Sequence, residues 1–306
     1  MNSSLPEEVL SFSRSARRRL GSLGGAELAL RAEQDRSERT AVGKALAELG
    51  VGELDVRDGE HQLLACAELC RVSGALALPW PLVEQLTAVG GRPLALVDLG
   101  RPRVDHGDVL DGWLGCDLDG NAHDLVVGTP TSAKLGPFLV PAELGAPQGR
   151  VSSDDVALHL VLGTWRLLGG LEAALAQVVE HVGVRRQFGR PLAEFQSVRF
   201  AVADASVAVR GLEELAKFTT WRLHCAPQPQ RLVDATALRL HGAEKAVQVL
   251  RACHQLLGAV GFCDEHDVSV LDRHLQPLIR LPLSAEALAA RLVPAVGRGE
   301  LETLFT

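Results

Sequence analysis

Apolar residues recur every three or four positions through the second half of the chain, a period that predicts long helices with one buried face. The longest stripe follows the sequence SSDD at residues 152–155, where a capping serine and acidic residues favour a helix start. The stripe ends at FGRP, residues 188–191, because proline cannot continue a helix. Its members are Val156, Leu160, Gly163, Leu167, Leu171, Leu175, Val178 and Val182.

Three further helices are predicted after this corner, at about residues 195–225, 232–257 and 284–296. Long helices joined by short connections usually pack antiparallel as a bundle. We therefore predict a C-terminal four-helix bundle over residues 151–306.

The first 88 residues carry the same helical period. Residues 38–54, ERTAVGKALAELGVGEL, predict a helix that ends at Gly50. Residues 61–88 predict two helices separated by the PWP sequence at 79–81, since proline interrupts a helix. We expect an N-terminal helical domain over residues 1–88.

The stretch from 89 to 150 has a different character, because Gly, Pro and Asp separate short apolar runs. The runs at 94–100, 123–129 and 137–141 predict strands joined by turns. The predicted fold class is therefore mainly α with a small, reduced β domain at 89–150 between two helical domains.

Composition narrows the possible partners. The 306 residues carry a formal net charge of −7, which argues against nucleic-acid binding, since that requires a basic face. No N-terminal signal-peptide pattern and no run of about 20 apolar residues is evident, so we expect a cytoplasmic protein without a membrane span. In that compartment the six cysteines should be reduced thiols.

Two candidate motifs do not support the chemistry that they suggest. The glycine-rich GSLGG at 21–25 follows no predicted strand and precedes no Lys-Ser/Thr pair, so we interpret it as a linker rather than a phosphate loop. Cys253, His254, Cys263 and His266 could suggest zinc. Adjacent helical residues such as Cys253 and His254 point about 100° apart, so we expect no metal site.

Two helix corners hold the remaining candidate chemistry. The first is RRQFGRPLAEFQ at 185–196 and the second is QLLGAVGF at 255–262. A guanidinium suits a pyrophosphate, and amides with an aromatic ring suit a heterocycle, although a solvated turn is the simpler interpretation. The groups concerned are the Arg185 guanidinium, the Gln187 and Gln196 amides, the Phe188 ring, and the Gln255–Gly258 turn.

The first corner resembles a motif of the acyl-CoA dehydrogenase family, R-x-x-F-G-x-x-[LI]-x-x-F/H-Q, followed here by Ala-Asp. The second is similar to that family's Q-x-x-G-G-x-G-[FY] element, with Ala259 in place of one glycine. The opening LAELGVGEL and the order of helices, β zone and bundle also fit. The resemblance implies α,β-dehydrogenation of an acyl-CoA thioester with FAD. It implies these cofactor-binding residues: Arg185, Gln187, Phe188, Phe195, Gln196, Gln255 and Gly258.

The chain departs from the family where the catalytic base is expected. In most members a glutamate lies about nine residues after the arginine that matches Arg273, and Pro282 occupies that position here. Glu286 lies nearby but inside the predicted last helix. A minority of members place the base earlier, where this chain has His159. His159 is a weak candidate base, and a structural histidine on the bundle surface is the alternative. The family's flavin-facing loops are also missing from the β zone, whose one tryptophan is Trp113.

Retained FAD-binding corners without the glutamate resemble one subunit of the heteromeric α2β2 steroid-type acyl-CoA dehydrogenases. The resemblance implies a homologous subunit as partner, or a second copy of this chain. It also implies an acyl-CoA substrate, but the sequence does not identify the acyl group. A flavin-free scaffold or regulatory subunit is the alternative. A homomeric enzyme with His159 as its base is a third possibility.

Overall fold

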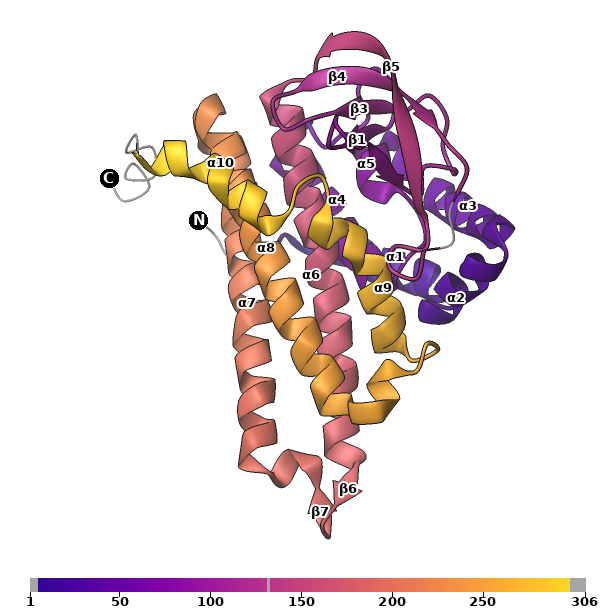
Figure 1. Ribbon diagram of the computed structural model, residues 1–306, viewed down its shortest axis with the longest axis vertical. Coiled ribbons are helices and arrows are strands. Elements are labelled where there is room, and N and C mark those ends of the chain that lie inside the picture. The colour runs from indigo at the N-terminus through magenta and orange to yellow at the C-terminus, as the bar shows by residue number, and fades with distance from the viewer. Residues whose placement is uncertain (1–4, 131–132, 298–306) are drawn as a thin grey trace.

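Four long helices form the C-terminal half of the structure, a computed structural model that describes residues 5–130 and 133–297 (Figure 1). The first helix, α6, begins where the sequence predicted, because the Ser152 hydroxyl accepts a hydrogen bond from the Asp155 backbone N–H at 3.1 Å. All eight residues of the predicted stripe are buried. The bundle helices are α6 (Ser153–Val184), α7 (Gln196–Cys225), α8 (Gln228–Leu257) and α9 (Asp267–Arg280).

The fourth bundle helix is α9, which the sequence analysis did not predict. It packs against both α6 and α8, and its buried face includes Val268, Leu271, Leu275 and Ile279. This spacing is helical, but Pro277 lies within the segment. Because proline normally interrupts a helix, the sequence did not indicate one here. The helix predicted at 284–296 exists as α10 (Ala285–Gly297), which crosses α8 as an additional element (Figure 1).

The position of α6 among neighbouring helices accounts for its apolar composition. By length and composition alone it is long and apolar enough to cross a membrane. In this structure α6 instead contacts α4, α7, α8 and α9. The Trp165 side chain at its middle is fully buried, and its Nε1 donates a hydrogen bond to the Thr220 hydroxyl at 2.9 Å.

The N-terminal helices pack onto the bundle mainly through α4, which lies along α6 (Figure 1). The break predicted at PWP is confirmed, since α4 ends at Ala75 and α5 begins at Leu82. Residues 22–25 form the turn between α1 and α2. The elements are α1 (Glu7–Gly21), α2 (Ala26–Gln34), η1 (Arg36–Arg39), α3 (Thr40–Glu48), η2 (Val51–Glu53), α4 (Gly59–Ala75) and α5 (Leu82–Leu86).

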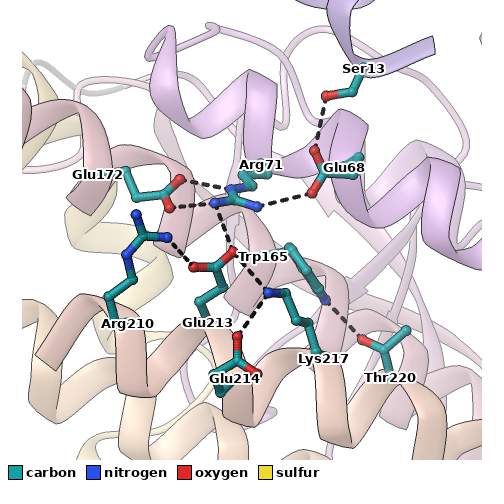
Figure 2. Close-up of polar contacts among 10 residues, drawn as sticks. All are labelled: Ser13, Glu68, Arg71, Trp165, Glu172, Arg210, Glu213, Glu214, Lys217 and Thr220. Carbon is teal, nitrogen blue, oxygen red and sulfur yellow. Dashed lines mark hydrogen bonds and ion pairs between the residues drawn. The ribbon is translucent and has the colours of Figure 1, made fainter. Parts of the chain in front are cut away.

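A network of charged side chains joins α4 to α6 and α7 (Figure 2). The Arg71 guanidinium contacts carboxylates from three helices, and the neighbouring Lys217 ammonium shares Glu213 with it. Buried charges are favourable only when paired, so the network fixes how the N-terminal helices dock. The three carboxylates around Arg71 belong to Glu68, Glu172 and Glu213.

The β zone is a five-stranded sheet of order β1-β3-β4-β5-β2 at one end of the bundle (Figure 1). Three predicted strands are confirmed as β1, β4 and β5, whereas the short strands β2 and β3 were not predicted. The Trp113 ring is buried under this sheet, and its Nε1 donates to the carbonyls of Gly107 and Leu110. The strands are β1 (Leu94–Leu96), β2 (Arg103–Asp105), β3 (Leu114–Cys116), β4 (Asn121–Val127) and β5 (Leu139–Arg150). The division of the chain into three domains at 88/89 and 150/151 stays a prediction.

Candidate functional site

The first motif corner folds as a two-stranded hairpin at the end of the bundle remote from the five-stranded sheet (Figure 1). Its strands are β6 (Arg186–Gln187) and β7 (Arg190–Pro191). The two residues between them, Phe188 and Gly189, have φ values of 51° and 82°, as a tight hairpin turn requires. The Arg186 guanidinium donates to the Gly189 carbonyl at 2.9 Å, which stiffens the turn.

The second corner lies at the same end of the bundle and forms one groove with the first. This groove has a volume of about 580 Å³, within the usual range for small-molecule sites. Four predicted cofactor-binding residues line it, namely Arg185 and Gln187 from the first corner and Gln255 and Gly258 from the second.

The glycine at the second corner keeps the groove floor open. Gly258 ends α8 with a φ of 63°, a conformation that favours glycine. A Cβ built there would meet no atom within 4 Å. A short 3₁₀ helix, η4 (Gly258–Phe262), follows, and the Gly261 backbone packs against Leu257.

The electrostatic character of the groove is cationic. None of its described lining residues is acidic, and Arg185 contributes an exposed guanidinium. His181, one turn before Arg185, also lines the groove and was not predicted. Partial burial, and then the charges of Arg185 and His266, lower the pKa of His181, so it is neutral at pH 7. The groove therefore suits an anionic ligand with hydrogen-bonding groups.

Three predicted cofactor-binding residues lie outside the groove lining. The Phe188 side chain is 90% exposed at the hairpin tip, and it meets the Phe195 ring edge-on with centroids 6.2 Å apart. The Arg190 guanidinium lies 4.1 Å from the Phe195 ring centroid, as in a cation–π contact. Gln196 is exposed at the start of α7. Phe188 and Gln196 are therefore exposed at this end of the bundle.

The two positions considered for a catalytic base line a second, much smaller cavity. His159 of α6 and Pro282, which follows α9, both border a space of about 40 Å³ between the bundle and strands β1 and β2. Such a volume holds one or a few water-sized species, and an acyl thioester does not fit. His159 is half-buried and lies where the bundle faces the sheet.

The His159 imidazole is held in one tautomer. Its Nδ1 lies 3.0 Å from the Thr87 hydroxyl, whose own proton is donated to the Val83 carbonyl at 2.8 Å. The Thr87 oxygen therefore accepts from Nδ1–H, which leaves Nε2 unprotonated. Burial, together with the charge of Arg239, lowers the pKa of His159 to about 3. The ring is neutral at physiological pH.

The other candidate residues have structural partners. Arg273 binds Glu33 at 3.1 Å and the Asp264 carbonyl at 2.9 Å. His254 contacts the Asp272 carboxylate and the Gly261 carbonyl. No group of three His, Cys, Asp or Glu side chains is placed to hold a metal ion within residues 5–130 and 133–297. All six cysteines lie in those ranges and are unpaired.

Comparison with known proteins identifies the class to which this fold and groove belong. Residues 161–278 match the sequence profile described as acyl-CoA dehydrogenase, C-terminal domain. Acyl-CoA dehydrogenase FadE28 of Mycobacterium tuberculosis is 29% identical over 249 residues, which cover 72% of this chain and 70% of that protein. The chain is a member of the acyl-CoA dehydrogenase family.

The extent of the similarity differs between relatives. A short-chain specific acyl-CoA dehydrogenase of Megasphaera elsdenii is 33% identical over 111 residues. That alignment spans 36% of this chain and only 27% of the relative. Among solved structures, the ChsE4-ChsE5 complex from M. tuberculosis matches with a TM-score of 0.78 at 18% identity, covering 97% of this chain and 99% of that chain. At this identity the match establishes the acyl-CoA dehydrogenase fold.

Proposed function

We propose that this chain is a subunit of an FAD-dependent acyl-CoA dehydrogenase that completes the FAD site of a homologous partner. The partner would supply the catalytic base. The proposal rests chiefly on the corner groove, where Arg185, Gln187, Gln255 and Gly258 meet around about 580 Å³ of open space.

The groove residues suit the adenine and pyrophosphate parts of FAD. The Arg185 guanidinium can donate two hydrogen bonds to phosphate oxygens, and no described acidic side chain in the groove opposes that charge. The Gln187 and Gln255 amides can bind the edge of a heterocycle, because each offers both donors and an acceptor. When bound, FAD would accept the hydride from the β-carbon of the acyl thioester.

The residues at the expected base positions support the proposal that the partner, and not this chain, supplies the catalytic base. Pro282 has no acid–base group, and the neighbouring His159 is a half-buried neutral ring beside a cavity of about 40 Å³. Substrate and base would therefore come from the partner. The ChsE4-ChsE5 structure, a complex of two named chains with a similar fold, is consistent with a heteromeric arrangement.

Co-expression with a homologue that carries the family glutamate provides the test. We expect a yellow complex that dehydrogenates an acyl-CoA. Arg185→Ala should weaken flavin retention roughly tenfold to a hundredfold, since a hydrogen bond to a charged group contributes about 1.5–3 kcal/mol. The flavin absorbance of the purified complex measures retention directly.

Arg199→Ala is the matched control, because Arg199 is an exposed arginine near the start of α7 that does not line the groove. It should leave flavin retention unchanged. Equal retention by Arg185→Ala and the parent complex would show that Arg185 does not hold the cofactor. A colourless complex would favour the flavin-free scaffold, and turnover by this chain alone that is lost in His159→Ala would favour the homomeric enzyme.

A further inference from the structure

The small cavity beside His159 is lined by a buried cation with an unpaired hydrogen-bond donor. Arg239 of α8 lines this cavity and is only 3% exposed. Its Nη2 donates to the Leu281 carbonyl at 2.8 Å, whereas Nη1 has no hydrogen-bond partner. Burial lowers the pKa of Arg239 to about 10, so the guanidinium is still charged at pH 7.

Other arginines with low exposure bind a carboxylate or two carbonyls, whereas Arg239 binds one carbonyl. Arg39, Arg71 and Arg222 each bind a carboxylate, at distances between 2.5 and 2.8 Å. Arg166 donates to two backbone carbonyls at 2.8 and 2.9 Å. A buried charge with too few partners is destabilising, and no residue in the described part of the chain supplies a hydrogen-bond partner for Arg239 Nη1.

The cavity has room for that compensation. A water molecule needs about 10–15 Å³ of such space, and about 40 Å³ is present. Two carboxyl groups also border the cavity, and burial raises the pKa of Glu84 to about 7 and that of Asp105 to about 6. The Glu84 Oε2 atom has no hydrogen-bond partner, and neither carboxyl is bonded to Arg239.

We propose that this cavity is a binding site for a small monovalent anion, such as chloride, which pairs with the Arg239 guanidinium. The anion replaces the missing carboxylate partner and satisfies Nη1. The space between helices α6, α8 and α9 and strands β1 and β2 is too small for larger anions, since its volume is only about 40 Å³. The site is separate from the corner groove and does not depend on whether the chain binds FAD.

Thermal unfolding of the full chain in sodium chloride and in sodium gluconate, at equal ionic strength, tests the proposal. Gluconate is too large for the cavity, so only chloride should stabilise the folded chain by binding there. Above the dissociation constant, each tenfold increase in chloride should raise Tm by about 2 °C, because an anion that binds only the folded state stabilises it by mass action. Arg239→Met should abolish this chloride-specific increase.

Arg222→Met is the matched control, because Arg222 is also buried but binds Asp234 within the chain. It should lower Tm in both salts and keep the chloride increment. An equal increment in Arg239→Met and the parent would overturn the proposal. So would the absence of any difference between the two salts in the parent chain.

A second measurement needs no variant. Crystals of the parent chain soaked in sodium bromide should show an anomalous peak in the cavity beside Arg239 Nη1. A cavity that contains only water, with no anomalous signal, would overturn the proposal even if Arg239→Met does not fold.

Discussion

Arg71 of α4 and Glu172 of α6 form a bidentate ion pair, with Nε 2.7 Å from Oε2 and Nη2 2.5 Å from Oε1 (Figure 2). The same guanidinium reaches Glu213 of α7 at 3.2 Å, so one side chain ties the N-terminal helices to two bundle helices. The side chains of Arg71 and Glu213 are largely buried, at 16% and 7% exposure.

Replacement of Arg71 by methionine should therefore cost about 3–5 kcal/mol of unfolding free energy, because it leaves buried carboxylates without their counter-charge. Urea denaturation measures this loss. Arg14→Met is the control, since Arg14 pairs with Glu7 on the surface of α1 and exposed pairs contribute little. Similar losses in the two variants would contradict a special role for Arg71.

The helices α4 and α6 cross at a glycine contact that admits no side chain. A Cβ on Gly169 would lie 1.8 Å from the Arg71 carbonyl oxygen, and one on Gly74 would lie 1.8 Å from that of Arg166. Gly169→Ala should therefore push the helices apart and destabilise the chain by about 3 kcal/mol or more, measured as a lower urea midpoint.

Gly183→Ala is the matched control for this contact. Gly183 lies in the same helix, and a Cβ there would meet no atom within 4 Å. The free energy of unfolding of that variant should increase by up to about 1 kcal/mol, since alanine is the better helix former. Two variants that were both neutral would show that the helices can separate without cost.

The raised pKa of Glu84 predicts how stability changes with pH. Burial raises it from 4.5 in a free side chain to about 7 in the fold, although the charge of Arg166 opposes the shift. Below pH 4.5 both states hold the proton and the contribution to stability is complete. Between pH 4.5 and 7 the unfolded carboxyl ionises first, so about 3 kcal/mol is lost as pH rises.

Glu84→Gln should remove this part of the pH dependence, which denaturation at pH 5 and pH 8 would measure. Glutamine cannot ionise, so the variant should be more stable than the parent at pH 8. The exposed Glu60→Gln change should leave the profile unaltered. A parent profile that stays flat from pH 5 to 8 would contradict the raised pKa.

The sequence predicted the elements whose hydrophobic period is long and uninterrupted. Helix α6 combines a stripe from Val156 to Val182 with a capping Ser152, so both its face and its start could be derived. Helix α9 was missed because Pro277 interrupts a short period. Strands β2 and β3 have three residues each and, unlike β1, do not lie in an uninterrupted apolar run of four.

The residues of the corner groove could be predicted from the sequence, because their types and the local turns determine their positions. Gly258 and the first-corner turn fix the backbone, so the meeting of Arg185 with Gln255 could be expected from the resemblance. The interior cavity could not, because it brings together Glu84, His159 and Arg239 from three helices. Only the packing of those helices against the sheet shows that Arg239 lacks a partner.

Our proposed heteromeric function predicts that the exposed phenylalanine at the hairpin tip contacts another subunit. Phe188 combines 90% exposure with a φ of 51°, a conformation that costs a bulky residue roughly 1–2 kcal/mol. Asparagine tolerates this backbone region, so Phe188→Asn should relieve strain while it loses the contact with Phe195. The two effects should nearly cancel, within about 1 kcal/mol of unfolding free energy for the isolated chain.

In the co-expressed complex the same variant should release flavin or partner more readily, which sedimentation and flavin absorbance measure together. Val126→Asn is the control, because Val126 is 60% exposed but lies on the distant sheet. It should change neither quantity. If Phe188→Asn left both assembly and flavin content intact, the hairpin tip would not be part of a subunit interface, and its strained backbone would need a different explanation. If the variant instead unfolded the isolated chain, Phe188 would be a structural residue that supports the turn.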